Sequence, residues 1–398
     1  MTTIGSSFSD QDLVQARRDT PGVNGRIHLD NCGSALMAQP VIDEMTVAFE
    51  REIAVGGYVA QEQQADKLSK GYVLLSELFG GGADDYAFVG SAVDGWTKAF
   101  YSIPFQPGDN IVTAYNEYCS NYVAYLQVAK LRGVEIKVAR QAQDGGIDLD
   151  HLGDLIDDGT RLISISHMPS SSGEINQVRD VGKIAKDRNV LYQLDACQSA
   201  GHIPVSVAEI GCDIMTGTSR KFLRGPRGIG FLYVNEQARA QMEPVVLTNQ
   251  SAEWSGADKY TLRDDTKVFE AWERSVINQL GFAAAIQYLL DLGVDKATGQ
   301  IAANASYLRK RLPAIKGVTV ECPTGAVSAI ITLNKAGLTP AQIKARLEEQ
   351  SIGVQIASVV HTRLDLEARG IESAVRVSPH YYTSKADMDG FLDALEAL

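Results

Sequence analysis

The sequence predicts an α/β protein: a large domain with a mostly parallel central sheet, followed by a smaller α+β domain. Short apolar runs of strand length, at residues 86–89, 111–114, 162–166 and 190–194, alternate with helical segments. This alternation is typical of right-handed strand–helix–strand units. At 398 residues the chain exceeds the size at which one hydrophobic core stops growing, so two domains are expected. After residue 293 the pattern changes to short strands and helices, which indicates the small domain.

The domain boundaries follow from this change of pattern. We expect residues 1–25 to form an N-terminal segment that packs on the small domain. Residues 26–290 would form the large domain and residues 291–398 the small C-terminal domain. Within the N-terminal segment, Ser9 is a candidate N-cap for a short helix, with Asp12 at the third helical position.

Several further elements are predicted from periodicity and breaker residues. A proline at position 40 opens an amphipathic helix over 40–51, and a second helix over about 62–79 ends at three consecutive glycines. Residues 254–266 are polar and aromatic without periodicity, which predicts a loop. A helix over 303–312 belongs to the small domain.

Composition and charge exclude several classes of function. The formal net charge is −12, from 37 basic and 49 acidic residues, and no basic block or basic helix occurs. This balance argues against a nucleic acid or an anionic membrane as partner. The first 20 residues lack an apolar core, and no stretch of about 18 apolar residues occurs, so neither a signal peptide nor a membrane span is expected. We therefore expect a cytoplasmic location.

The cysteines and histidines do not suggest a metal. Five cysteines are scattered without a C-x-x-C pair, which predicts reduced thiols and neither a disulfide framework nor a zinc site. The six histidines show no H-E-x-x-H spacing.

Residues 190–234 contain the strongest concentration of candidate catalytic side chains in the chain. Asp195 ends an apolar run, and so should lie at the carboxyl edge of the sheet, where open α/β sheets bind ligands. Lys221 lies among Arg220, Arg224 and Arg227. Neighbouring positive charges disfavour a charged amine, so we expect a lowered pKa for Lys221 and a free amine able to form a Schiff base.

This stretch resembles the aminotransferase class V family of pyridoxal phosphate (PLP) enzymes, of fold type I. The resemblance lies in Asp195-x-x-Gln198 after a strand, and in Thr218-Ser219-Arg220-Lys221 before a glycine-rich turn, and it extends over essentially the whole chain. It implies that Lys221 holds PLP as a Schiff base, that Asp195 pairs with the pyridinium nitrogen, and that Gln198 contacts the ring O3'. A carboxylate against that nitrogen keeps it protonated, which makes PLP an electron sink.

The resemblance also places the PLP phosphate. Ser91, Ala92 and Val93 follow the strand at 86–89 and open a helix, whose free N–H groups suit an anion. Thr218 and Arg220 are further candidates for cofactor binding.

Two more candidates for the cofactor site follow other strands. Tyr118 stands where the resemblance implies a ring that stacks on PLP, commonly a histidine, and is also a catalytic candidate. A tyrosine transfers protons less readily than a histidine near neutral pH. His167, after the strand at 162–166, would contact O3' where relatives carry asparagine. The alternatives are a core aromatic residue and a structural histidine.

The substrate side is implied by two motifs. Arg376 lies in Arg-x-Ser-x-x-x-Tyr, where the resemblance implies a clamp on the substrate carboxylate, and Gly33 would border the substrate. A surface arginine and a plain strand end are the alternatives. No cysteine lies at 355–366, where desulfurases carry their persulfide cysteine, so desulfuration by a mobile cysteine is not expected.

A homodimer is implied as well, although one contact between subunits departs from the family pattern. Relatives carry a threonine that reaches the PLP phosphate of the neighbouring subunit, and this chain has Trp272-Glu273 there. An acidic side chain repels a phosphate, so we expect Glu273 to point elsewhere.

The expected function is a PLP-dependent lyase. Lys221 would remove the Cα proton of a small amino substrate, and loss of a β substituent would then release ammonia and a carbonyl product. The motifs look nearest the isopenicillin N epimerase and ergothioneine C–S lyase branch, related to the cysteine desulfurases. Epimerase (racemase) and aminotransferase activities are the alternatives, because all three share the first carbanion, and a non-catalytic binding protein is a further class.

Overall fold

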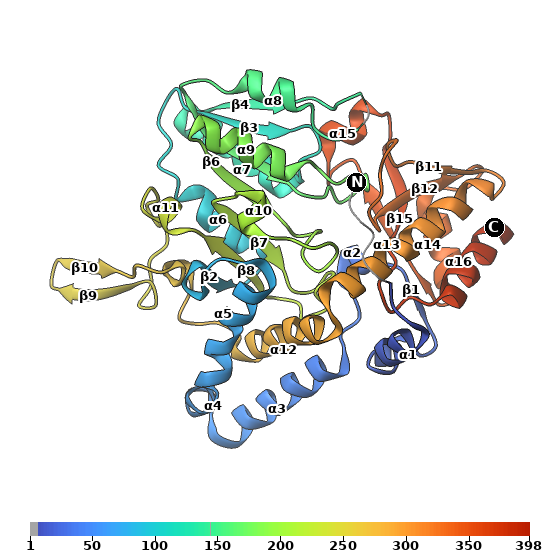
Figure 1. The fold of residues 1–398 in the computed structure, drawn as a ribbon, viewed down its shortest axis with the longest axis horizontal. Coiled ribbons are helices and arrows are strands. Elements are labelled where there is room, and N and C mark those ends of the chain that lie inside the picture. Colours follow the sequence, from blue (N-terminus) through green and yellow to red (C-terminus); the bar gives the residue numbers. More distant parts are fainter. Residues whose placement is uncertain (1–6, 144) are drawn as a thin grey trace.

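The computed structural model describes residues 7–143 and 145–398, and a seven-stranded sheet lies at its centre (Figure 1). The strand order is β2-β8-β7-β6-β5-β3-β4. Strands β3 to β7 are parallel, and β8 is antiparallel to both β2 and β7. The predicted α/β fold with a mostly parallel sheet is confirmed. The strands are β2 (Tyr86–Val89), β3 (Asn110–Ala114), β4 (Glu135–Ala139), β5 (Thr160–Ser166), β6 (Leu191–Asp195), β7 (Ile214–Thr218) and β8 (Gly230–Val234).

Two apolar cores lie on opposite faces of this sheet, because successive side chains of a strand alternate between faces. Leu162 belongs to the core beneath α6 (Ala92–Tyr101) and α7 (Cys119–Arg132). Its neighbour Ile163 belongs to the core that includes α5 (Ala65–Phe79) and α9 (Val178–Arg188). The central strands are buried on both faces, and only their ends are left for polar chemistry.

The C-terminal part contains a second, antiparallel sheet with the order β11-β12-β15-β14. Its strands are β11 (Val318–Val320), β12 (Ile331–Lys335), β15 (Ser373–Val377) and β14 (Gln355–Ser358). The helices α14 (Pro340–Glu348) and α16 (Lys385–Ala397) share an apolar core with this sheet. Strand β15 contributes Arg376, which donates a hydrogen bond to the carbonyl of Ser170, after β5.

The N-terminal residues contact this C-terminal part. Helix α1 (Asp10–Arg18) begins at the predicted cap, where Ser9 and Asp12 form a capping box. Arg17 forms an ion pair with Asp387 of α16. Strand β1 (Ile27–His28) pairs with β13 (Ile352–Gly353), although the sequence assigns residues 27–28 to the large domain. The proposed boundaries near residues 25 and 290 stay predictions.

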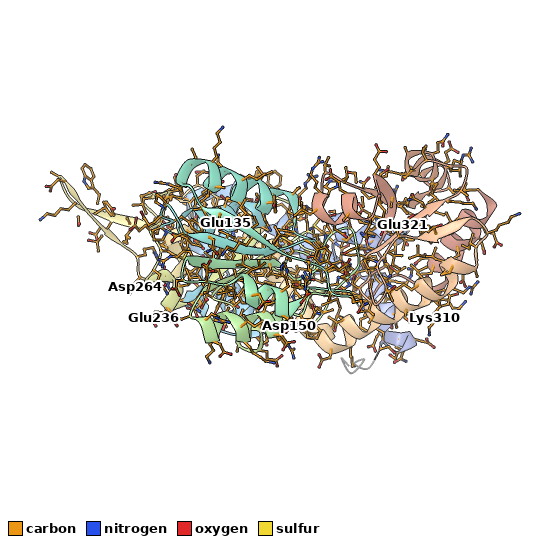
Figure 2. All side chains as sticks on the ribbon, turned by 90° about the horizontal axis from the view of Figure 1, so that it is seen from above. Glu135, Asp150, Glu236, Asp264, Lys310 and Glu321 are labelled. Carbon is orange, nitrogen blue, oxygen red and sulfur yellow. The ribbon has the colours of Figure 1, made fainter. Side chains whose placement is uncertain are left out.

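Some predicted elements are wrong or incomplete. Residues 254–266 are not a loop: β9 (Ala252–Gly256) and β10 (Lys259–Leu262) form a hairpin that projects from the body (Figures 1 and 2). The helix expected at 62–79 is interrupted at Gln64, between α4 (Gly57–Gln63) and α5. The helix expected at 303–312 starts earlier, as α13 (Val294–Arg311).

Charged side chains cover the outer surface, as the six labelled residues in Figure 2 illustrate. Each helix in the described part of the chain is too short or too polar to cross a membrane.

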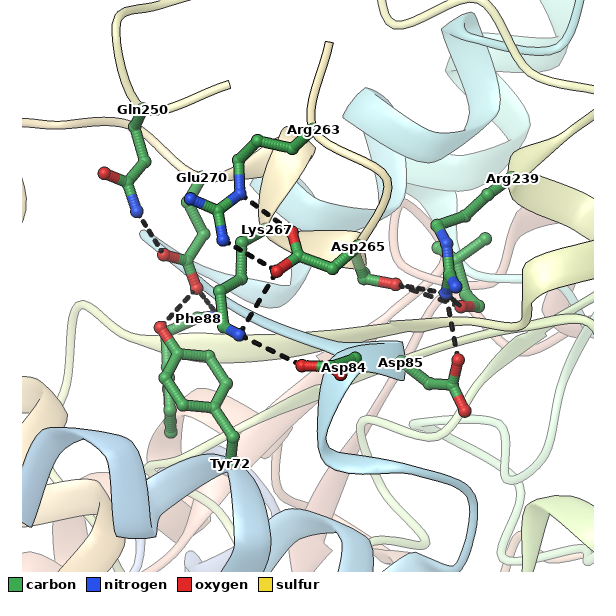
Figure 3. Close-up of polar contacts among 12 residues, drawn as sticks. Tyr72, Asp84, Asp85, Phe88, Arg239, Gln250, Arg263, Asp265, Lys267 and Glu270 are labelled. Atoms are coloured by element: carbon green, nitrogen blue, oxygen red, sulfur yellow. Dashed lines mark hydrogen bonds and ion pairs between the residues drawn. The ribbon is translucent and has the colours of Figure 1, made fainter. Parts of the chain in front are cut away.

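A polar network fixes the base of the β9–β10 hairpin against β2 (Figure 3). We call it the hairpin-base network; its charged members are Asp84, Asp85, Arg239, Arg263, Asp265, Lys267 and Glu270. Arg263 forms a two-pronged pair with Asp265, at 2.8 and 2.7 Å. Glu270 accepts hydrogen bonds from the Phe88 backbone N–H and the Tyr72 hydroxyl, both at 2.8 Å. The segment before α12 (Val276–Leu292) is thereby held beside the large sheet.

Candidate active site

A cavity of about 300 Å³ lies at the carboxyl edge of the large sheet, where polar residues follow several parallel strands. Ser91 follows β2, Asp195 ends β6, and Lys221 follows β7. Because these strands run in the same direction, the residues after them meet at one edge. The cavity is lined by Ser91, Ala92, Val93, Trp96, Tyr118, Asn121, Ser166, Met168, Ser170, Asp195, Cys197, Gln198, Thr218, Arg220, Lys221, Arg227, Gly228 and Ile229.

Nine of the twelve predicted site residues line this cavity. Gly33, His167 and Arg376 do not line it. The structure thus brings together the residues expected around the cofactor except His167, and their individual roles stay predictions.

Lys221 lies in a tight turn after β7. A side chain at Gly225 would collide with the Ser219 hydroxyl, so the turn requires glycine there. Burial is the main cause that lowers the pKa of Lys221, and Arg220 lowers it further. The sequence attributed the lowered pKa to three arginines, but the Arg224 guanidinium is occupied elsewhere, by the carbonyl of Leu36 and two hydroxyls.

Asp195 is fixed by two donors. The Asn121 side-chain amide donates to Oδ2 at 3.0 Å, and the Cys197 backbone N–H donates to Oδ1 at 2.8 Å. The carboxylate is buried, with 8% of the residue exposed, and lines the same cavity as Lys221. A carboxylate held in this way suits a partner for a ring nitrogen.

Gln198 and His167 were both expected to contact the O3' oxygen of PLP. The Gln198 amide donates to the Cys32 carbonyl at 3.1 Å, while its Oε1 is buried without a partner among residues 7–143 and 145–398. His167 is buried and does not line the cavity, and burial lowers its pKa to about 3. Strand alternation places its neighbours Ser166 and Met168 on the cavity wall instead. The expected contact of His167 with O3' is therefore not supported by this geometry.

Tyr118 lies on the cavity wall, half-buried, at the N-cap of α7. Burial is the main cause that raises the pKa of Tyr118, and the neighbouring Cys119 and Cys197 raise it further. The phenol is therefore protonated at neutral pH. It suits stacking or proton donation better than proton removal.

The two predicted substrate residues lie just outside the cavity lining. Arg376 contacts Asp30 at 3.4 Å and donates to the carbonyl of Ser170, a cavity residue, at 3.2 Å. Gly33 accepts a hydrogen bond from Arg220 at its carbonyl. A side chain at Gly33 would collide with the Asp30 carboxylate. This close contact is enough to explain why position 33 is a glycine, without any contact to a substrate.

The sequence did not single out several residues of the site. Asn121 lies one turn along α7 from Tyr118, and no helix was predicted there. Ser166 pairs in register with Asp195 across β5 and β6, a placement that strand alternation could have indicated. Arg227 lines the cavity together with Ser91 and Ala92, and it was noted only for its charge.

The residues present fit PLP. The cavity offers a buried amine on Lys221, a fixed carboxylate on Asp195 and an unsatisfied oxygen on Gln198. Ser91 also lines the cavity as the N-cap of α6, and the first N–H groups of a helix have no partner within the helix. That end of the helix suits the phosphate. When bound, PLP supplies the electron sink for a carbanion.

Fold and site therefore define a PLP-dependent enzyme of fold type I. Residues 27–391 match the sequence pattern of aminotransferase class V, and the chain belongs to this family. Its cofactor is PLP.

Known proteins of similar length resemble the whole chain. The probable cysteine desulfurase of Methanothermobacter thermautotrophicus is 25% identical over 96% of this chain and 97% of its own. That of Pyrococcus abyssi is 27% identical over 96% of both chains. The apo structure of cysteine desulfurase from Thermococcus onnurineus superposes with a TM-score of 0.90 at 25% identity, covering 98% of each chain. The expected placement nearest the epimerase and ergothioneine lyase branch is not supported, because these relatives are cysteine desulfurases.

Proposed function

We propose that the chain is a PLP-dependent lyase that breaks a β C–S bond in a small amino acid. The observation that carries this proposal is the pairing of a buried amine, Lys221, with a buried carboxylate, Asp195, in one cavity. The relatives named cysteine desulfurases support a β-thio substrate. With water, such a substrate gives a thiol, a keto acid and ammonium, so that atoms and charge balance.

Each residue has a distinct task in this proposal. Lys221, whose pKa is lowered mainly by burial, accepts the Cα proton. Asp195 holds the proton on the ring nitrogen of PLP. Tyr118 keeps its phenolic proton at neutral pH and lies on the cavity wall, which suits a donor to the departing sulfur.

Arg376 would bind the substrate carboxylate. Its ion pair with Asp30 is long, at 3.4 Å, and its buried Nε has no partner in the described structure. An arginine with an unused donor can exchange a weak partner for a bidentate one. Neither β14 nor the segment 359–366 after it contains a cysteine, so the proposed reaction releases its sulfur product without a persulfide on that segment.

The test is product release from a panel of β-thio amino acids with PLP-loaded protein and no keto acid acceptor. We expect equal amounts of thiol, ammonia and keto acid, and loss of all three in Lys221→Ala. Exchange of the Cα proton with deuterated water, without release, would instead support an epimerase. Turnover that requires a keto acid would support an aminotransferase.

We also propose a homodimer. Large apolar side chains are exposed at the hairpin, where Trp254 is 80% and Tyr260 62% exposed, and on α3 (Gln39–Val55), where Ile53 is 71% exposed. Trp254 of β9 and Tyr260 of β10 stand on paired strands, and contiguous exposed apolar surface marks association sites. Sedimentation of the wild-type chain and of a Trp254→Ser, Tyr260→Ser variant tests this proposal, and a wild-type monomer would refute it.

A further inference from the structure

Behind Asp195 lies a second buried carboxyl group, that of Glu117. The residue is 4% exposed and sits between β3 and α7. No lysine, arginine or histidine forms an ion pair with it among the described residues. Its carboxyl oxygens accept only from neutral donors: the Tyr118 backbone N–H at 2.7 Å, Asn121 at 3.0 Å, Thr113 at 3.2 Å, Tyr125 at 3.5 Å, and the Ser166 hydroxyl.

One side-chain amide connects this group to the cofactor partner. Nδ2 of Asn121 donates to Oε1 of Glu117 and to Oδ2 of Asp195, both at 3.0 Å. The amide has two hydrogens, so both are used, one for each carboxyl group. A change of charge on Glu117 is therefore felt at Asp195 through one amide and a short distance in a buried region.

We infer that Glu117 is a positioning residue whose charge sets how firmly Asp195 holds the proton on the ring nitrogen of PLP. This inference rests on the proposed role of Asp195. An ionised Glu117 adds negative charge behind Asp195 and stabilises the protonated ring. A neutral Glu117 removes that charge and weakens the electron sink.

The surroundings of Glu117 place this change near neutral pH. Burial, the largest cause, and the charge of Asp195 raise the pKa of Glu117 to about 7, against the opposing hydrogen bonds from Ser166, Tyr118 and Asn121. Tyr125 of α7 and Tyr192 of β6 also face it, and burial raises the pKa of both phenols well above their usual value, so they stay neutral. Within the described residues, the titratable groups facing Glu117 are thus Asp195, Tyr125 and Tyr192, and the polar side chains facing it are those of Thr113 of β3, Asn121 of α7 and Ser166 of β5.

The direct readout is nitrogen NMR of PLP labelled at the ring nitrogen, in the substrate-free enzyme, between about pH 5.5 and pH 8.5. In the wild type we expect the ring-nitrogen signal to shift with a midpoint near the pKa of Glu117, towards the more firmly protonated form as pH rises. In Glu117→Gln, whose amide does not titrate, this shift should be lost while PLP still binds. A wild-type profile that persists unchanged in Glu117→Gln overturns the inference.

A second variant keeps the inference testable if Glu117→Gln does not fold. Ser166→Ala leaves Glu117 in place but removes a hydrogen bond that lowers its pKa, so the midpoint should move to higher pH. An unchanged midpoint would again overturn the inference. Glu174→Gln is the matched control, because Glu174 is also buried and accepts from a tyrosine hydroxyl, at 2.8 Å, without contacting Asp195. Its profile should equal that of the wild type.

The measurement separates this inference from the proposed function. It uses no substrate, so a failure to release thiol leaves the spectrum interpretable. Asp195→Asn should give an unprotonated ring nitrogen across the range. If Asp195→Asn and the wild type give the same signal, the role of Asp195 has failed. If they differ but Glu117→Gln matches the wild type, only the coupling has failed.

Discussion

The molecule contains two dense polar networks, which differ in the partners of their carboxyl groups. In the hairpin-base network, every carboxylate except that of Glu270 pairs directly with a cation, as Asp85 does with Arg239 at 2.9 Å. Behind the active-site cavity, Glu117 and Asp195 share one neutral amide and lack a direct ion pair in the described residues. Direct pairing stabilises charge, whereas the nearby charge of Asp195 helps to raise the pKa of Glu117, which forms no ion pair with a cation in the described residues. In our proposal, the first network holds a segment in place, whereas the second tunes a proton.

A substitution at Asp195 should show the largest difference between the two networks. If Asp195 holds the ring-nitrogen proton as proposed, replacing it by asparagine removes the charge that does so, and we expect kcat for thiol release to fall by about 100-fold or more, with a much smaller change in KM. Steady-state kinetics of the PLP-loaded variant provide the measurement. The matched change in the other network is Asp265→Asn, which should leave kcat within about twofold. Equal losses in both variants would contradict the division between the networks.

Arg376 tests whether an ion pair near the site is structural or exchangeable. We expect Arg376→Lys to raise KM for amino acid substrates by about 10-fold to 100-fold, because a lysine cannot form the bidentate pair with a carboxylate, while kcat changes less. The substrate amide, which lacks the carboxylate, supplies the control. If the amide loses as much as the acid, Arg376 acts by keeping Asp30 in place and not by clamping substrate.

Buried histidines lead to a prediction on how the stability of the folded state depends on pH. The backbone N–H of Ala329 donates to Nε2 of His202 at 2.9 Å, so Nδ1 carries the proton given to the Gln198 carbonyl at 3.0 Å. Burial lowers the pKa of His202 and of His167 to about 3, below the unfolded value near 6.5. A lowered histidine pKa stabilises the folded state above the unfolded pKa, and this contribution is lost as pH falls towards the folded pKa.

As pH falls from 6.5 to 5, each of these histidines binds a proton in the unfolded chain but not in the folded one. Each should therefore lower the free energy of unfolding by about 2 kcal/mol over this range. Urea unfolding of the wild type and of His202→Gln measures it, and the variant should show a shallower loss. Parallel pH dependences in the two proteins would show that His202 titrates normally in the folded state.

Site residues that lie close together in the sequence could be predicted from it. Asp195, Gln198 and Lys221 stand in short motifs beside strands, so their position at the sheet edge follows from strand direction. Contacts that depend on side-chain direction were harder to predict. His167 and Ser166 are neighbours, and strand alternation decides which one faces the cavity. Asn121 belongs to a helix whose apolar residues show little periodicity, so neither the helix nor its contact with Asp195 was expected.

The β9–β10 hairpin shows the same limit for the fold. Its strands are exposed on both faces, so they lack the alternation of apolar and polar residues that identifies a half-buried strand. Pairing between the two strands, which a single-strand pattern does not contain, decides their structure. Strand β7 was not predicted either. It contains Gly217, and glycine is uncommon in strands, but a larger residue there would collide with the Phe231 ring.

Lys267 gives the smallest expected effect and the strictest test of the contrast. Its amine pairs with Asp265 at 3.3 Å and with Asp84 at 3.4 Å, and Asp84 is 80% exposed, so solvent screens much of the attraction. We expect Lys267→Met to lower the free energy of unfolding by less than about 1 kcal/mol, with salt reducing the difference. Urea unfolding at low and high salt measures both. A loss of several kcal/mol, or a change in the ring-nitrogen NMR profile, would mean that the hairpin-base network also supports the active site, and the two networks would then have to be treated as one.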